Sequence, residues 1–216
     1  MLPILTIDIL KQEAAIFARN QSSHDEPALY GVTDGKAVGT YLEHRFREYL
    51  VEKYTYVLGS SAKGIDFPEL NVDLKTTSVR QPQSSCPFKS ARQKVYGLGY
   101  HLMVFVYQKS DDAQLQAGKL DIQYTIFIDA TKTADYQTTT GLRAIIENNG
   151  NFDDVFAFFS ERMLPLDEIQ TQALAEEVFE NPPEIGYLTI SNALQWRLQY
   201  SRVIQQAGSI SGIDVL

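Results

Sequence analysis

Hydrophobic residues in the first part of the chain recur at the three- and four-residue spacing of amphipathic helices. This spacing predicts a helix over residues 6–20, followed by the polar loop NQSSHDEP. The segment VTDGKAVG at 32–39 predicts a turn. A second helix is expected from Thr40 to about Lys53, because Thr40 and Glu43 match a capping box, in which each side chain bonds a backbone N–H at the helix start.

The next part of the chain has the alternation and the apolar runs of strands. The predicted strands are TYVL at 55–58, the stretch around Ile65, LNVDLKTTSV at 70–79, HLMVFVYQ at 101–108 and LDIQYTIFIDA at 120–130. The fourth is a nearly continuous apolar run, which is typical of a strand buried on both faces. Ahead of it, Ser90 can cap a short helix in ARQKVYGLG.

Helical spacing returns in the last third of the chain. The predicted helices cover residues 141–149, 152–163, 166–179 and 190–206, and Ser191 is the expected N-cap of the last. The order of elements predicts an α/β fold with a mixed β-sheet core flanked by helices. We expect a single domain over residues 1–216, with the α/β core at 1–135 and a helical extension at 136–216.

The composition is that of an ordinary globular protein, with 44% hydrophobic and 21% charged residues. The opening segment lacks a basic stretch followed by an uncharged apolar run, and no segment approaches the roughly 18 apolar residues of a membrane span. The single cysteine, Cys86, fits a reducing compartment. We therefore expect a cytoplasmic protein with no membrane partner.

The charge is distributed unevenly. The formal net charge is −8, which by itself argues against a nucleic-acid partner, yet no Asp or Glu occurs between Leu74 and Ser110. The basic residues of this stretch that we select as candidate contacts to a DNA backbone are Arg80, Lys89, Arg92 and Lys94. The alternative is that these side chains form an ordinary solvated surface.

The segment GIDFPELNVDLKTTS contains the candidate chemistry. Side chains alternate along a strand, so Asp73 and Lys75 share one face while Val72 and Leu74 share the other. If the intervening FPE segment turns the chain, Asp66 lies alongside Asp73. Two adjacent carboxylates repel each other unless a hard cation lies between them, and Mg²⁺ accepts one or two carboxylates together with water and phosphate oxygens. Mg²⁺ can polarise a phosphodiester and activate water, while Lys75 offsets the developing charge.

These residues resemble the site of the restriction-endonuclease-like superfamily of nucleases, the PD-(D/E)xK group, over residues 40–108. The gap between the acids also resembles that of a mismatch-repair nicking endonuclease. The resemblance implies a restriction-endonuclease-like fold in which Asp66 and Asp73 hold the metal, Lys75 assists the nucleophile and Glu43 on the preceding helix completes the site. Ile65 stands where the family has proline, and Pro68 follows Asp66, which keeps Glu69 as an alternative first acid.

Each of these motifs also has a structural interpretation. An acid-x-Lys triplet occurs by chance, and Asp34-Gly35-Lys36 is a second copy between two glycines. A surface hairpin with a salt bridge would explain Asp73 and Lys75, and the capping box would explain Glu43. Among the remaining candidates, the three histidines are too scattered for a zinc site, Cys86 lacks a catalytic histidine pattern, and no phosphate-binding glycine loop occurs. Side chains near the C-terminus either reach DNA bases or pack in the core: Trp196, Arg197, Gln199 and Arg202.

We therefore expect a Mg²⁺-dependent endonuclease acting on double-stranded DNA, of the type II restriction class. Cutting both strands of a palindrome requires two sites related by a dyad, which implies a homodimer. The alternatives are a nicking or repair endonuclease with the same site and a non-catalytic DNA-binding module with the same fold.

Overall fold

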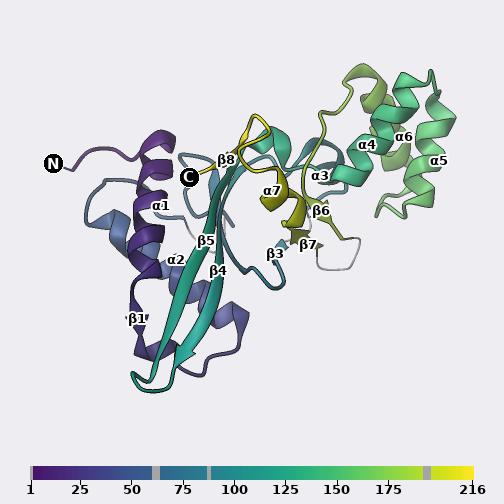
Figure 1. The fold of residues 1–216 in the computed structure, drawn as a ribbon. Coiled ribbons are helices and arrows are strands. Elements are labelled where there is room, and N and C mark those ends of the chain that lie inside the picture. Colours follow the sequence, from purple (N-terminus) through teal and green to yellow (C-terminus); the bar gives the residue numbers. More distant parts are fainter. Residues whose placement is uncertain (1, 60–63, 87–88, 192–195) are drawn as a thin grey trace. The chain divides into compact units, whose positions relative to one another are not determined.

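The computed structural model describes residues 2–59, 64–86, 89–191 and 196–216 (Figure 1). They form two compact units that are interleaved in the sequence. The first unit comprises 1–84, 101–128 and 206–216, and the second comprises 85–100 and 129–205. The predicted boundary at residue 135 does not follow this division, because residues 85–100 belong to the second unit and 206–216 to the first. A single cooperative domain stays a prediction.

The first unit is built on a mixed β-sheet with the strand order β1-β5-β4-β2, and β8 pairs with β5 as well. The strands are β1 (Asp25–Glu26), β2 (Val72–Ser78), β4 (His101–Asp112), β5 (Ala117–Ile128) and β8 (Ile213–Val215). The β2–β4 pair is parallel, whereas β4 and β5 form a long antiparallel hairpin with a bulge at Val106/Tyr107. The α/β class with a mixed sheet and flanking helices is thus confirmed.

Two helices cover this sheet, α1 (Ile7–Ser22) against β5 and α2 (Gly35–Val51) against β2 (Figure 1). A short 3-10 helix, η1 (Pro27–Leu29), follows β1. The apolar faces of the helices meet the sheet through an aromatic cluster: Phe46 lies 5.0 Å from Phe17 and 5.2 Å from Phe105 between ring centroids. These rings are buried and form the centre of the core of the unit.

The start of α2 differs from the prediction. The helix begins at Gly35, with Asp34 as N-cap accepting a bond from the Lys36 N–H, so the expected turn at 32–39 and the capping box are both wrong. Glu43 therefore lies in the middle of α2. By contrast, α1 agrees with its prediction, with Thr6 as N-cap.

The predicted strand at 55–58 is also wrong: Thr55 alone forms an isolated bridge, to Ile4, and Val57 and Leu58 are exposed. The stretch around Ile65 forms no named strand, but the adjacent Phe67 bridges to Val72. The strand predicted at 70–79 is present as β2.

The second unit contains helices packed on one another and a small sheet with the strand order β3-β7-β6. Its elements are α3 (Arg92–Tyr96), η2 (Ala130–Lys132), α4 (Tyr136–Glu147), α5 (Phe152–Glu161), α6 (Glu168–Glu180), β6 (Thr189–Ile190), β7 (Trp196–Gln199) and α7 (Ser201–Gln206), with β3 (Gln83–Cys86) at the junction of the two units. The helices predicted at 141–149, 152–163 and 166–179 correspond to α4, α5 and α6. Their buried core includes Val95, Leu142, Phe159 and Val178.

The single helix predicted over 190–206 is wrong. Ile190 pairs with Leu198 in an antiparallel hairpin, and only the last part of the segment, α7, is helical. Leu198 and Tyr200 are buried while Arg197 and Gln199 are exposed. Burial therefore alternates with the two-residue period of a strand, in a segment whose apolar residues also fit helical spacing. Within the described residues, no helix has the length and apolar character needed to cross a membrane.

Candidate active site

A tight turn in the first unit places two aspartates opposite each other. Phe67 and Val72 bond each other reciprocally, with N–H to O distances of 2.9 and 3.2 Å. Between them Asn71 adopts a left-handed conformation with φ of 53°, which asparagine tolerates well. The next pair outward along the two arms is Asp66 and Asp73, and the two carboxyl groups are near enough for Asp66 to contribute to the raised pKa of Asp73. The sequence-based expectation that the turn would bring them together agrees with this geometry.

Asp73 is buried, with 3% of its surface exposed, and it pairs with Lys75 on the same strand. The Lys75 ammonium lies 2.7 Å from Asp73 Oδ2. Burial raises the pKa of Asp73 to about 6, an effect that the charge of Lys75 opposes and the neighbouring Asp66 reinforces. Burial also disfavours the charge of Lys75, yet the carboxylates around it, Asp73 foremost, raise its pKa above the ordinary value.

Asp66 is held from two sides. Its Oδ2 accepts the backbone N–H of Leu74 at 3.0 Å, and its Oδ1 lies 3.6 Å from Arg47 Nη1. Arg47 was absent from the sequence-derived candidates. The signal that could have identified it is its spacing of four residues from Glu43, which places both side chains on the same face of α2. Glu69, the alternative first acid, is exposed at the turn.

Glu43 completes the cluster from α2. Burial raises its pKa to about 7, and the charge of Asp66 adds to this effect while Lys75 and Arg47 oppose it. Because α2 begins at Gly35, Glu43 does not cap the helix. The capping box therefore no longer explains why a glutamate occurs at this position. The other acid-x-Lys copy does have such a role, since Asp34 caps α2 through the Lys36 N–H.

The cluster thus combines three carboxylates with two cations, Lys75 and Arg47. The pKa values of Glu43 and Asp73 are raised first by burial and further by the nearby charge of Asp66, while Lys75 lowers both. Oxygen donors with unbalanced negative charge suit a hard divalent cation. Over the described residues, no group of three or more Asp, Glu, His or Cys side chains is arranged to hold a metal ion. Mg²⁺ accepts one or two carboxylates with the remaining ligands from water and substrate, so Asp66 and Asp73 could hold it.

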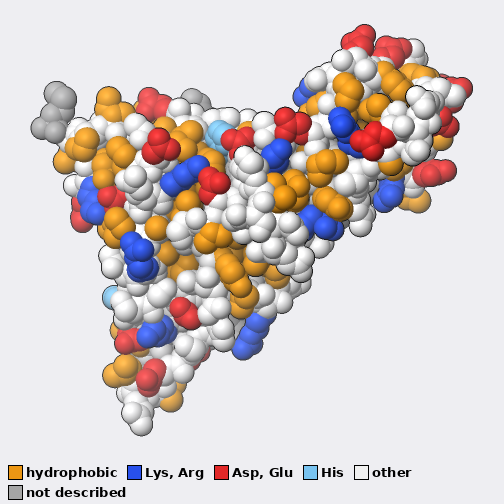
Figure 2. All heavy atoms as spheres, turned by 45° about the horizontal axis from the view of Figure 1, so that its top comes forward, with side chains coloured by type: hydrophobic (Ala, Val, Ile, Leu, Met, Phe, Trp, Pro, Cys, Tyr) orange, Lys and Arg blue, Asp and Glu red, His pale blue; other side chains and the backbone are white. Residues whose placement is uncertain are grey.

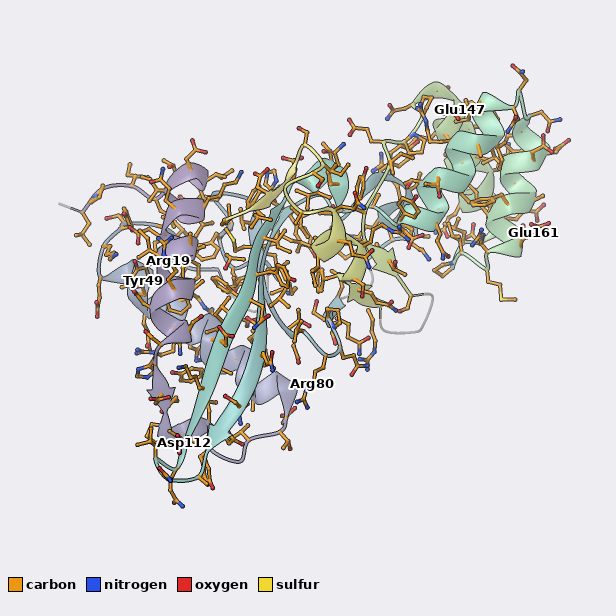
Figure 3. All side chains as sticks on the ribbon, in the orientation of Figure 1. Arg19, Tyr49, Arg80, Asp112, Glu147 and Glu161 are labelled. Carbon is orange, nitrogen blue, oxygen red and sulfur yellow. The ribbon has the colours of Figure 1, made fainter. Side chains whose placement is uncertain are left out.

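The four basic candidates have different surroundings. Arg80, labelled in Figure 3, follows β2 in the first unit and is exposed. In the second unit Lys89 is exposed, but Arg92 Nε donates to Glu177 Oε2 at 3.0 Å. Lys94 is only 5% exposed, and burial lowers its pKa against the opposing effect of Asp135. Lys94 therefore does not offer a surface charge to DNA, contrary to its assignment from the sequence.

The remaining basic surface is mixed. On the face of the first unit turned toward the viewer in Figure 2, Lys and Arg side chains alternate with Asp and Glu side chains. The cation of Arg202 in the second unit stacks on Tyr136, with 3.6 Å between the guanidinium carbon and the ring centroid. The side chain of Trp196 lies outside the described residues. Cys86 is buried and forms no disulfide, and its Sγ lies 3.6 Å from the Tyr100 hydroxyl.

Comparison with known proteins decides the family. A family model described as "Type II restriction enzyme NspV" matches residues 4–215. A protein named "Type II restriction enzyme NspV", from Nostoc sp. (strain ATCC 29411 / PCC 7524), is 60% identical over 210 residues, which are 97% of this chain and 96% of the relative. The chain belongs to the NspV family of type II restriction enzymes. This finding confirms the restriction-enzyme class expected from the sequence. No solved structure matches the chain.

The NspV family match covers both units, because it runs from residue 4 to residue 215. The helical part that the sequence-level resemblance to residues 40–108 left unassigned is therefore common to the family.

Proposed function

We propose that this protein is a Mg²⁺-dependent endodeoxyribonuclease that cuts double-stranded DNA at a specific sequence, with Asp66, Asp73, Lys75 and Glu43 at its active site. The observation that carries the proposal is the juxtaposition of Asp66 and Asp73 across the Phe67–Val72 turn, with Lys75 beside Asp73. The related Nostoc protein is named a type II restriction enzyme, and enzymes of that class cleave DNA.

Asp66 and Asp73 would hold the cation, because the Phe67–Val72 turn brings the two carboxylates together beside β2, the edge strand of the sheet. When bound, Mg²⁺ supplies polarisation of the scissile phosphate and activation of water. Asp66 keeps its orientation through the Leu74 N–H, and Asp73 through the Lys75 ammonium. Burial of these groups excludes bulk water and strengthens each charge interaction.

Lys75 serves as the positive charge nearest the reacting phosphate. Its pKa is raised, so the amine is protonated at neutral pH and acts as a cation rather than as a base. An ammonium held in place before the reaction stabilises negative charge developing on the phosphate oxygens without reorganisation. Glu43, whose pKa of about 7 lies near neutral pH, can hold or release a proton at its carboxylate as the charge of the site changes.

We extend the proposal to the assembly and the compartment. Cutting both strands of a symmetric site requires two copies of this active site, so the active form is a homodimer bound across the dyad. Arg80 and Lys89 are the exposed cations that would contact the phosphate backbone. A cytoplasmic location fits a chain whose single cysteine, Cys86, forms no disulfide within it.

The test is digestion of supercoiled plasmid DNA with the purified protein, with Mg²⁺ and with EDTA. Discrete fragments that require Mg²⁺ support sequence-specific double-strand cleavage. Nicked circles alone would favour the nicking or repair endonuclease, and bound but intact DNA would favour the non-catalytic module. Cleavage that persists in EDTA would contradict the metal assignment.

A further inference from the structure

The two carboxylate oxygens of Asp66 are held by different elements. Oδ2 accepts the Leu74 N–H from β2 at 3.0 Å, whereas Oδ1 faces Arg47 Nη1 on α2 at 3.6 Å. The Asp66 side chain is 18% exposed and that of Arg47 is 26% exposed, so the ion pair is partly shielded from water. The carboxylate plane of Asp66 is therefore defined by both a strand and a helix.

Arg47 is itself anchored to the turn that carries the aspartates. Its Nε donates to the carbonyl of Glu43 at 3.4 Å, one helical turn earlier. Its own carbonyl accepts the Tyr56 hydroxyl at 3.1 Å, and the Tyr56 ring packs against Phe67 at 5.5 Å between centroids. Since Phe67 adjoins Asp66, the part of α2 around Arg47 is connected to this turn by two routes, the Arg47–Asp66 ion pair and the contact of Tyr56 with Phe67.

We infer that Arg47 is a positioning residue, which holds Asp66 in the orientation that faces Asp73 and thereby builds the divalent-cation site. The reason is electrostatic: without a cation at Oδ1, repulsion between the two facing carboxylates turns Asp66 away. The inference rests on the proposed function, because it assigns Arg47 a role toward the cation that Asp66 and Asp73 would share.

Whether removal of Arg47 weakens or strengthens cation binding distinguishes a positioning role from a purely electrostatic one. If Arg47 acted only through its positive charge, its removal would leave the site more negative and strengthen cation binding. If Arg47 positions Asp66, its removal weakens cation binding despite the more negative site. Loss of a residue that orients a metal ligand typically lowers metal affinity by about 10- to 100-fold.

The experiment measures Mn²⁺ binding to the DNA-free protein at pH 8, by the loss of the free Mn²⁺ signal in electron paramagnetic resonance. Mn²⁺ is used because it is a divalent cation that prefers the same oxygen ligands as Mg²⁺, and Mg²⁺ competition verifies the shared site. The variants are Arg47→Met, which keeps the aliphatic stem, and Arg47→Lys, which keeps the charge. The matched control is Arg45→Met on the same helix, because Arg45 is 48% exposed and pairs with Glu48.

Arg47→Met should weaken Mn²⁺ binding about tenfold or more, Arg47→Lys less, and Arg45→Met not measurably. Equal or tighter binding by Arg47→Met overturns the inference. Thermal unfolding checks that each variant is folded. If Arg47→Met does not fold, Arg47→Gln, which keeps a polar side chain without the charge, replaces it, and equal or tighter Mn²⁺ binding by Arg47→Gln overturns the inference.

A parallel titration of Asp73→Asn separates this inference from the proposed function. If the parent protein binds no Mn²⁺, or if Asp73→Asn binds it as the parent does, the metal site itself fails and the inference fails with it. If Asp73→Asn loses binding while Arg47→Met retains it, the proposed function stands and only the role of Arg47 is rejected.

Discussion

The Lys75 ammonium lies 2.7 Å from Asp73 Oδ2, and both side chains leave the same face of β2. The side chain of Asp73 is 4% exposed and that of Lys75 is 19% exposed, so the two charges depend on each other more than a surface pair does. This pair differs from the surface hairpin that the sequence left open as an alternative, because its carboxylate is buried.

The first prediction concerns Asp73. Asp73→Asn should lower the cleavage rate by about 10³-fold, equivalent to roughly 4 kcal/mol of lost transition-state stabilisation, because it removes an anionic oxygen from the proposed metal site. Asp73→Asn also takes its nearest carboxylate from the largely buried Lys75 ammonium, so it should destabilise the protein by about 1–3 kcal/mol, and unfolding must be measured to separate this effect from the loss of cleavage. Plasmid cleavage, DNA binding and urea unfolding measure the three quantities. Cleavage at the parental rate would reject Asp73 as a site residue.

The second prediction uses the Asp73–Lys75 pair as a double-mutant cycle. Lys75→Met leaves a buried carboxylate without its cation and should destabilise the protein by about 2–4 kcal/mol at pH 8. Asp73→Asn combined with Lys75→Met should be less destabilised than Lys75→Met alone, because neither member of the pair is left as a buried charge without its partner. Urea unfolding in EDTA measures the four proteins of the cycle. Strictly additive losses would show that the pair is energetically unimportant.

The third prediction follows from the raised pKa of Glu43. A carboxyl group with a folded pKa of about 7 binds more protons in the folded state than in the unfolded state, between its ordinary pKa of 4.5 and 7. The metal-free protein should therefore lose stability as the pH rises through this window, by at most about 3 kcal/mol from Glu43. Unfolding in urea with EDTA, at pH 5 and pH 8, should show a smaller loss for Glu43→Gln than for the parent. If the parent and Glu43→Gln lose the same stability between pH 5 and pH 8, the pKa of Glu43 is not raised in the folded protein.

The sequence was sufficient where a pattern had one physical solution. The alternation around Asp73 permits only one sorting of charged and apolar side chains, and the run at 101–108 could only be a buried strand. The sequence places Asp66 beside Asp73 only if the FPE segment turns the chain, and the Phe67–Val72 bridge closes such a turn.

The sequence was insufficient where one pattern of residues fits two structures, or where a contact depends on how two elements pack. Thr40 and Glu43 match a capping box, but Asp34 is also an N-cap residue and it begins the helix earlier. Leu198 fits helical spacing and also the period of a strand, and its pairing with Ile190 decides for the strand. The meeting of Arg47 with Asp66 depends on how α2 packs against β2, which no local pattern specifies.

The fourth prediction distinguishes exposed from buried basic residues. Arg80→Ala should weaken DNA binding and reduce the slope of log affinity against log salt by about 0.9, because an exposed cation that contacts a phosphate releases one counterion. Lys94→Met should leave this slope unchanged, since Lys94 is buried. Filter binding in EDTA at several salt concentrations measures both. A reduced slope for Lys94→Met, or none for Arg80→Ala, would reverse the assignment.

The fifth prediction concerns Glu13, which ties α1 to α2 away from the candidate site. Burial would raise the pKa of Glu13, but hydrogen bonds from Tyr49, Tyr54 and Lys53 outweigh this effect and lower the pKa below 4.5. Tyr54 donates at 2.6 Å and Lys53 at 2.9 Å, and Tyr49, labelled in Figure 3, donates from α2. A carboxyl group whose folded pKa is lowered adds stability that is present above its ordinary pKa and is lost as the pH falls through the folded pKa.

Glu13→Gln should therefore destabilise the protein by roughly 1–2 kcal/mol at pH 7, because charge-assisted hydrogen bonds become neutral ones. The difference from the parent should shrink as the pH falls below 4.5, because the unfolded carboxyl group takes up its proton before the folded one does, and it should be lost as the pH falls through the lower folded pKa. Glu48→Gln on α2 is the matched control, because the Glu48 side chain is 66% exposed and its pair with Arg45 contributes little. Urea unfolding at pH 7 and pH 4 compares the three proteins. A loss for Glu13→Gln that is the same at both pH values would show that the charge of Glu13 does not stabilise the contact between α1 and α2.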